Sequence, residues 1–254
     1  EKGEPWDFSL PAKRKEAEDM VDEKEPDLLI GSPMCTEFSP WQPLNIAKSA
    51  NPEEFEARKK AAVVHLAFVC KLYMKQLKAG RLFLHEHPMQ ASSWNEECIK
   101  KVLDKHGVTT VVMDQCQYGQ MDKDGNPIKK PTRWMSNGPR LLSHLCTRCT
   151  GRRGECSGEN AGQRHRPCYG EIAKAAAIYP FKLCRAILEG LRDELDQRGR
   201  VVAHLGIVLP KMDLEQDEDD HIARLESAFN AIAAKHLLLT QPRHSDPDKL
   251  NATT

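Results

Sequence analysis

Short apolar runs alternate with amphipathic segments along the first half of the chain, a pattern typical of α/β proteins. Residues 27–31, 81–86 and 108–113 are apolar or β-branched, and each run predicts a buried strand. Between them, apolar positions in residues 51–79 and 92–105 recur at helical spacing. Strands that alternate with helices in this way predict a mostly parallel sheet with crossover connections.

The longest predicted helix has clear signals at both ends. Asn51 is a good cap, Pro52 suits the first helical position, and Gly80 is a stop signal. Residues 10–24 also favour a helix, whereas the prolines in residues 39–50 predict a loop.

The pattern changes after Asp114, where Gly, Pro, Lys and Cys become frequent. The segments that follow are expected to be a loop at 119–137, an irregular Cys-rich stretch at 146–168, a helix at 170–195, a strand or helix at 201–209, a helix at 221–239, and a disordered tail from 241. We therefore expect a Rossmann-like α/β domain at residues 1–140, a basic Cys-rich insertion at 141–169, helices that return to the sheet at 170–240, and the tail at 241–254.

Composition narrows the class of protein. The 254 residues suit one domain with additions, and 37 Lys plus Arg balance 37 Asp plus Glu, so net charge indicates no partner. Nine cysteines, four of them within residues 146–168 and the others scattered, favour an intracellular, reducing compartment (the nucleus in a eukaryote), with metal binding or catalysis as their roles. No signal peptide or membrane-spanning run is evident, and a first residue other than Met suggests a segment of a longer chain with further domains.

Polar clusters follow all three predicted strands. They are Gly31 to Ser39, His85 to Pro88, and Asp114 to Gly119. Because ligands bind beyond the carboxyl ends of parallel strands, the three clusters should share one rim. A thiol and a carboxylate would then meet in one pocket, which suits covalent catalysis with proton transfer.

These residues resemble the DNA cytosine-5 methyltransferase family. Residues 27–39, a strand that ends in Gly followed by a loop with Cys35 before Phe-Ser, are similar to that family's nucleophile loop, and Pro-Met-Cys-Thr-Glu-Phe-Ser is their most specific part. Glu86 is similar to the Glu of the family's Glu-Asn-Val motif. Tyr118-Gly119 followed by Thr132-Arg133-Trp134 resembles a later Tyr-Gly and Gln-x-Arg-x-Arg element. The resemblance covers residues 6–137, and more weakly 170–190.

The resemblance implies a class I methyltransferase-like sheet and a mechanism on a flipped cytosine in DNA. Cys35 would attack C6, Glu86 would hold and protonate N3, and Arg133 would support the loop or the intermediate. S-adenosylmethionine would supply the methyl group to C5, with Asp7 and Pro33 at the cofactor.

The chain departs from the family pattern at several positions. Met34 stands where the family has the Pro before Cys, Thr36 replaces Gln, and His87-Pro88 replaces Asn-Val. The Gly-rich first strand and turn that cradles the cofactor is absent from this sequence, so either it lies upstream in a longer chain or the cofactor site is lost. The alternative is therefore a catalytically inactive nucleic-acid-binding or scaffold module of a larger polyprotein.

The Cys-rich stretch has the character of a zinc site. Its candidate ligands are Cys146, Cys149, Cys156, His165 and Cys168, which compete for four places, with His144 as a further candidate. Without a core of its own, such a loop would fold more readily around a metal. A flexible loop with reduced thiols is the alternative.

Basic residues gather in the same part of the chain. Residues 129–166 hold nine Lys or Arg against two Glu, which predicts a phosphate-contacting surface for DNA. The residues expected to contribute most are Lys129, Lys130, Arg148, Arg152 and Arg153. A third function, zinc-dependent hydrolysis, would rest on His85, Glu86 and His87 together with the cysteines, although adjacent residues of a strand point in opposite directions.

Overall fold

The computed structural model describes residues 6–47, 51–200 and 238–239. The predictions for 201–209 and for the tail from 241 lie outside these residues. The last two residues of the predicted helix at 221–239 are described, and they form a short strand instead.

Helices and strands alternate through the first half of the chain, as the apolar pattern predicts. In chain order the elements are α1 (Pro11–Lys24), β1 (Leu28–Gly31), η1 (Thr36–Phe38), α2 (Gln42–Ala47), α3 (Pro52–Lys78), β2 (Leu82–Pro88), η2 (Ser92–Asn95), α4 (Glu97–Leu103), β3 (Thr109–Asp114), η3 (Gln115–Tyr118), β4 (Pro131–Ser136), α5 (Pro139–Ser143), α6 (Gly170–Ala175), α7 (Phe181–Gln197) and β5 (Leu238–Leu239).

The strands form one mixed sheet in the order β3-β4-β2-β1-β5. β1 pairs in parallel with β2 and with the two-residue β5, whereas β4 is antiparallel to both β2 and β3. Because β4 runs against both neighbours, β1, β2 and β3 all run in one direction. Their carboxyl ends therefore lie along the same rim of the sheet, as expected. The mostly parallel, Rossmann-like sheet is not confirmed, since two of the four pairings are antiparallel.

β4 corrects the prediction of a loop at residues 119–137. Gly, Pro and Lys dominate the first part of that stretch, but Thr132 to Ser136 pairs on both sides within the sheet. Trp134 and Met135 are fully buried, one on each face. A short strand covered on both faces has no alternation of polar and apolar residues, which is why the pattern did not reveal it.

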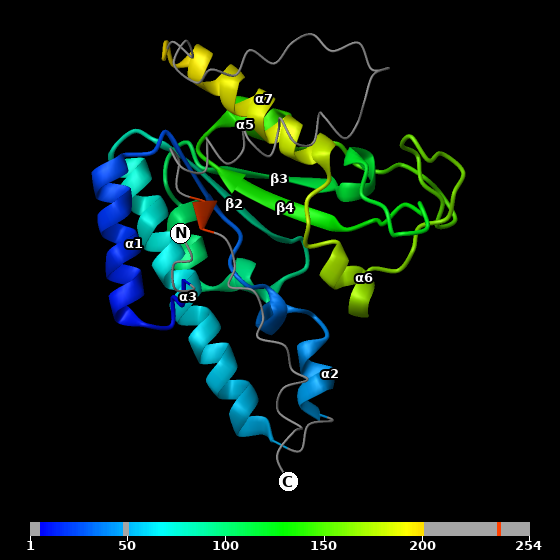
Figure 1. The fold of residues 1–254 in the computed structure, drawn as a ribbon, viewed down its shortest axis with the longest axis horizontal. Helices are drawn as coiled ribbons and strands as arrows, with labels where there is room; N and C mark the ends of the chain where they lie inside the picture. The colour runs from blue at the N-terminus through cyan, green and yellow to red at the C-terminus, as the bar shows by residue number, and fades with distance from the viewer. Residues whose placement is uncertain (1–5, 48–50, 201–237, 240–254) are drawn as a thin grey trace.

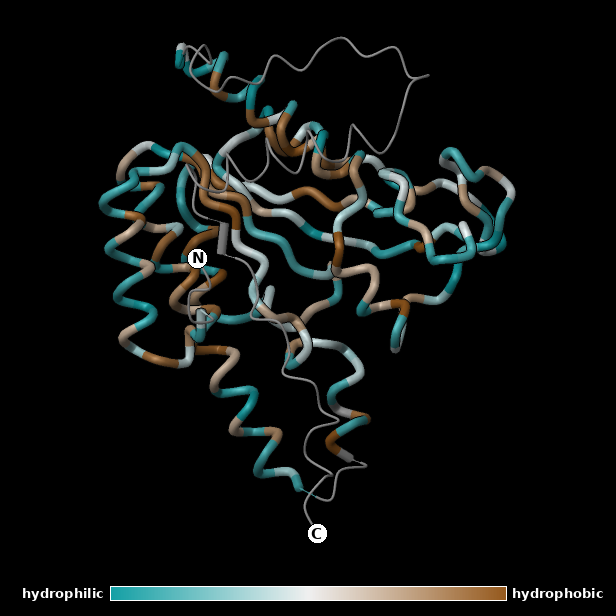
Figure 2. The backbone as a smooth tube through the Cα atoms, in the orientation of Figure 1, coloured by the Kyte–Doolittle hydropathy of each residue, from teal (hydrophilic) through white to brown (hydrophobic). Residues whose placement is uncertain are grey.

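Helices cover both faces of the sheet (Figure 1). On one face α1, α3 and α4 pack on Leu29, Phe83 and Met135; on the other, α5 and α7 pack on Leu84 and Trp134. Hydrophobic residues concentrate in the strands and the inner sides of these helices, whereas the Cys-rich segment, residues 146–168, is mostly hydrophilic (Figure 2).

Two other predictions change in detail. Helix α2 occupies part of the predicted loop at 39–50. The predicted helix at 170–195 is two helices, α6 and α7. The helical conformation is interrupted before Pro180, which caps the start of α7. None of the helices described is both long and apolar enough to cross a membrane.

Candidate functional site

Five side chains from four parts of the chain meet at the rim of the sheet, and we call them the rim site. They are Ser32, Cys35, Glu86, Lys130 and Tyr179. The parallel pairing of Gly31 with His85 places the residues after β1 next to the end of β2. Cys35 and Glu86 are close enough for the charge of the carboxylate to act on the thiol. The predicted meeting of thiol and carboxylate therefore has a structural basis.

Glu86 has a buried carboxyl group, and one of its two oxygens has no hydrogen-bond partner among the described residues. Burial raises its pKa, and the charge of Lys130 and hydrogen bonds from Tyr179 and Ser32 oppose that rise. The hydroxyls of Ser32 and Tyr179 lie 3.0 Å apart. Oε1 of Glu86 is buried and has no hydrogen-bond partner among the described residues. Such an atom has unused capacity to bind a polar group.

Cys35 lies at the start of η1 and is half-buried, so its sulfur is not sealed in the core. Burial raises the pKa of the thiol, the charge of Glu86 raises it further, and Lys130 lowers it. The thiol is therefore protonated at neutral pH when Glu86 is ionised. Protonation of Glu86 removes the like charge that opposes the thiolate, so the two groups are coupled.

Two members of the rim site, Ser32 and Tyr179, were not predicted as site residues. Ser32 lies within residues 27–39 but was given no role there, and Tyr179 stands just before α7, far away in sequence. Lys130 was expected on a nucleic-acid surface, but it precedes β4, and its Nζ donates to the carbonyl of Ala176 at 3.0 Å. Its place at the rim could not be predicted from the sequence, because it depends on β4.

The two histidines beside Glu86 point to the opposite face of the sheet. His85 contacts Tyr73 of α3, at 3.0 Å between Nδ1 and the hydroxyl, and both histidines are fully buried. His87 Nε2 donates to the carbonyl of Pro33 at 2.8 Å, so it fastens the Cys35 loop to β2. The hydrolase hypothesis therefore loses its His-Glu-His site, because these imidazoles and Glu86 point to opposite faces.

Arg133 does not join the rim site. It sits on β4 next to Trp134, and its guanidinium lies 4.5 Å from the ring centre of Trp94 and donates to Thr110 Oγ1 at 3.1 Å. These contacts lie on the His87 face, opposite Glu86, because neighbouring residues of a strand alternate. The prediction that Arg133 supports the cysteine loop does not match this placement.

The two residues expected at the cofactor have other partners. The carboxylate of Asp7 accepts a hydrogen bond from the amide of Ser9 at 2.9 Å. Pro33 is buried, and its carbonyl accepts the bond from His87. A cavity of about 190 Å³ lies at the other end of the strands, lined in part by Asp27 and Leu82, and is remote from Cys35.

A second group of side chains could hold a metal ion, and we call it the Cys3His cluster. It comprises Cys116, Cys149, Cys156 and His165, whose ligand atoms all lie within 4.8 Å of one another. Three of the predicted metal ligands are therefore brought together, and Cys116 is the one that was missed. It follows β3, outside the span of about 20 residues in which closely spaced zinc ligands are usually sought.

Two predicted ligands lie elsewhere. Cys146 is exposed, and its thiol donates to the carbonyl of Ser143 at 3.1 Å. Cys168 is half-buried near the rim site, where burial raises its pKa and Lys130 lowers it. Neither belongs to the Cys3His cluster.

The hydrogen bonds around Cys149 favour its thiolate. Burial raises the pKa of this thiol, but bonds from the side chain of Ser157 and from the amides of Gly151 and Ser157 outweigh burial and lower the pKa to about 6. A neighbouring thiol, Cys116, is raised to about 12, chiefly by burial. One proton therefore leaves this pair readily, and the second stays in the absence of a cation.

The predicted basic residues differ in whether their side chains already hold partners within the protein. Lys129 donates to the carbonyl of Cys149 at 3.4 Å, and Arg148 forms an ion pair with buried Asp114 at 2.8 Å. Arg152 and Arg153 are exposed on the Cys-rich segment. These two are the predicted DNA contacts best placed to reach a phosphate.

Comparison with known proteins adds no identification to this geometry. No protein-family model matches the chain, no curated protein matches its sequence, and no solved structure matches its fold.

Proposed function

We propose that the chain performs the target-base chemistry of a cytosine-5 methyltransferase-like reaction on DNA. The observation that carries the proposal is the meeting of Cys35 and Glu86 at the ends of adjacent parallel strands. The order of motifs resembles the family, and the rim site supplies a nucleophile and an acid in one place. A Rossmann-like ancestry is compatible with the sheet, because β4 alone runs against β1, β2 and β3.

Glu86 has the properties that base activation requires. When a thiolate adds to C6, electron density moves into the ring, and a proton delivered to N3 stabilises it. Burial raises the pKa of Glu86, which keeps a proton available for that transfer. Its unpartnered Oε1 would face the base, while Ser32 and Tyr179 hold the carboxyl in place.

Cys35 would form the covalent bond. The thiol first releases its proton to solvent. The Sγ–C6 bond then forms as the C5–C6 double bond opens, its electrons move through C5–C4 towards N3, where the proton from Glu86 is accepted, and C5 becomes nucleophilic. A neutral Glu86 and the cation of Lys130 together favour the thiolate. The target base must leave the stack to reach this rim.

The methyl donor implied by the resemblance is S-adenosylmethionine, which would supply the group that C5 takes. The described residues do not fit it: Asp7 and Pro33 are engaged in the protein's own hydrogen bonds, and the sequence has no Gly-rich turn. The proposal therefore assigns Cys35 and Glu86 to the base and assigns no residue to the donor.

Hydrogen exchange at C5 tests this proposal without a methyl donor. Reversible addition at C6 makes C5 exchange its hydrogen with water, so DNA labelled with tritium at cytosine C5 should release label. We expect release with the wild-type chain and with Cys146→Ser, and none with Cys35→Ser. Glu86→Gln should slow release by about 10²–10⁴-fold, the usual contribution of a general acid.

A positive result has a second, independent readout. DNA containing 5-azacytosine, which can be trapped by addition at C6 without a methyl donor, should form a covalent adduct with the wild-type chain, and Cys35→Ser should abolish it. If the chain binds DNA but neither exchange nor adduct occurs, the non-catalytic nucleic-acid-binding module is the correct function.

We also propose that the ion of the Cys3His cluster is Zn²⁺. Thiolates and imidazole are ligands that Zn²⁺ prefers, whereas Mg²⁺ and Ca²⁺ prefer oxygen. Metal analysis of the purified, reduced chain tests this assignment.

A further inference from the structure

The Cys3His cluster joins two parts of the chain that are distant in sequence. Cys116 lies in η3, directly after β3, whereas Cys149, Cys156 and His165 lie in the Cys-rich segment. An ion held by all four would connect this segment to the rim of the sheet.

The spacing of the ligand atoms fits a tetrahedral ion. With Zn–S bonds of about 2.3 Å and a Zn–N bond of about 2.0 Å, neighbouring sulfur and nitrogen ligands are separated by about 3.5 Å. Cys149 Sγ and His165 Nε2 are 3.5 Å apart. All four ligand atoms lie within 4.8 Å of one another, so a small inward movement completes the shell.

Outer hydrogen bonds already orient the ligands. His165 Nδ1 donates to the carbonyl of Gly154 at 3.0 Å, which leaves Nε2 free to bind a metal. The amide of Gly158 donates to Cys156 Sγ at 3.4 Å, and the hydroxyl of Ser157 donates to Cys149 Sγ at 3.5 Å. Donors of this kind stabilise thiolates, the form that binds metal.

The Cys-rich segment has no hydrophobic core apart from these cysteines. Within residues 146–168, all of which are described, Cys149 and Cys156 are the buried residues. Together with Cys116 they form a separate apolar cluster of three side chains. Burial of so little apolar surface does not offset the conformational entropy of ordering a segment of this length.

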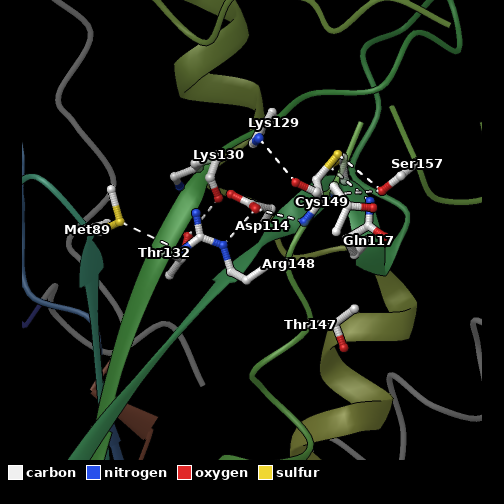
Figure 3. Close-up of polar contacts among 12 residues, drawn as sticks. Met89, Asp114, Gln117, Lys129, Lys130, Thr132, Thr147, Arg148, Cys149 and Ser157 are labelled. Carbon is white, nitrogen blue, oxygen red and sulfur yellow. Dashed lines mark hydrogen bonds and ion pairs between the residues drawn. The ribbon is translucent and has the colours of Figure 1, made fainter. Parts of the chain in front are cut away.

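Further contacts fix where the segment lies (Figure 3). The buried carboxylate of Asp114, the last residue of β3, accepts bonds from Arg148 Nε at 2.8 Å and from the amide of Cys149 at 2.9 Å. The amide of Asp114 donates to the carbonyl of Thr147 at 3.1 Å. These bonds place the first ligand of the segment beside Cys116.

We infer that the bound Zn²⁺ is a closed structural clamp that fastens the Cys-rich segment to the end of β3 through Cys116. Four protein ligands leave no open position for water or substrate, so the site is not catalytic. The clamp holds the stretch between Cys149 and Cys156, which carries the exposed Arg152 and Arg153, at the end of β3. The inference rests on the Zn²⁺ assignment and not on the proposed methyl transfer.

Metal content tests the ligand set. The wild-type chain, Cys146→Ser and Cys168→Ser should each contain about one zinc per chain. Loss of an outer-shell partner lowers metal affinity by about 10–100-fold. Cys116→Ser removes a ligand and should lower zinc affinity by more than that. Retention of zinc in Cys116→Ser together with its loss in Cys146→Ser would overturn the ligand set, and absence of metal from the wild-type chain would overturn the Zn²⁺ assignment as well.

A conservative exchange separates ligation from misfolding. His165→Cys supplies a fourth thiolate and should keep zinc, whereas His165→Ala should lose affinity. The absorption of the Co²⁺-loaded chain should change between wild type and His165→Cys, because a nitrogen ligand is replaced by sulfur. An unchanged spectrum would exclude His165 as a ligand.

Limited trypsin digestion tests the clamp itself. Removal of the metal with a chelator should speed cleavage after Arg152 and Arg153 at least tenfold, while cleavage after the exposed Lys15 of α1 stays the same. If zinc is present and chelation leaves all these rates unchanged, the metal assignment holds and the clamp is wrong.

Discussion

The imidazole of His87 connects the cysteine loop to β2, and it should make stability strongly dependent on pH. It is fully buried, donates from Nε2 to the carbonyl of Pro33, and accepts from the hydroxyl of Ser93. Burial lowers its pKa to about 4, the bond to Pro33 raises it in part, and the charges of His65 and Lys130 lower it further. The folded protein therefore keeps His87 neutral.

The size of the effect follows from the two pKa values. An unfolded histidine binds its proton near pH 6.5, and the folded one near pH 4. The contribution of His87 is therefore fully present above pH 6.5 and is lost as the pH falls towards 4. At about 1.4 kcal/mol per pKa unit, the loss reaches about 2 kcal/mol at pH 5 and about 3 kcal/mol at pH 4.

His87→Gln isolates this contribution, because the glutamine amide can still donate to Pro33 but does not titrate. Urea unfolding of both proteins from pH 7.5 to pH 4.5 gives the difference in the free energy of unfolding. That difference should shift towards the variant by about 2 kcal/mol between pH 7.5 and pH 5. His85 is present in both proteins and largely cancels. Parallel pH curves would show that His87 is not buried as a neutral group.

Three further variants test the rim and the surface. Burial raises the pKa of Glu86, so its contribution to the free energy of unfolding is full below about pH 4.5 and is lost at higher pH. Glu86→Gln should therefore gain stability relative to the wild type as the pH rises to 8, measured by the midpoints of urea unfolding. A difference between the two midpoints that stays constant with pH would contradict this. A Cβ on Gly31 would lie 2.1 Å from the hydroxyl of Tyr73, so Gly31→Ala should lose about 1–3 kcal/mol in thermal unfolding, and Tyr73→Phe in the same chain should recover part of it. Changing Arg152 and Arg153 to Ala should reduce the slope of log affinity for DNA against log salt by about 2, whereas neutralising two lysines of α1 should leave it unchanged.

The sequence contains the signals for the elements with strong patterns. The cap at Asn51 begins α3, with the side chain accepting from the amide of Glu54 at 3.2 Å, and the three apolar runs form β1, β2 and β3. The convergence of their ends follows from their common direction. β4 could not be predicted, because its place depends on pairing with β2 and β3, and its local sequence follows a stretch rich in Gly and Pro.

In the candidate sites too, some residues are predictable from the sequence around them, whereas others depend on contacts with distant parts of the chain. Cys35 and Glu86 follow strands and were predictable, whereas the contacts of Tyr179 depend on how the chain returns to the sheet before α7. Cys116 could be identified as part of a strand-end cluster, but its partnership with Cys149 depends on the folding of the segment beyond β4. Local motifs indicate residues, and tertiary structure decides which of them meet.

The position of β4 between β2 and β3 has a consequence for the order of assembly. The stretch that joins β3 to β4 is shorter than the one that joins β2 to β4. Closing the loop between β3 and β4 therefore costs less conformational entropy, and their pairing should form first. β1 and β2, which need the crossover through α3, should then dock onto the free edge of β4. Packing of Val111 against Trp134 should then govern the refolding rate, whereas substitutions near β1 should mainly change the unfolding rate.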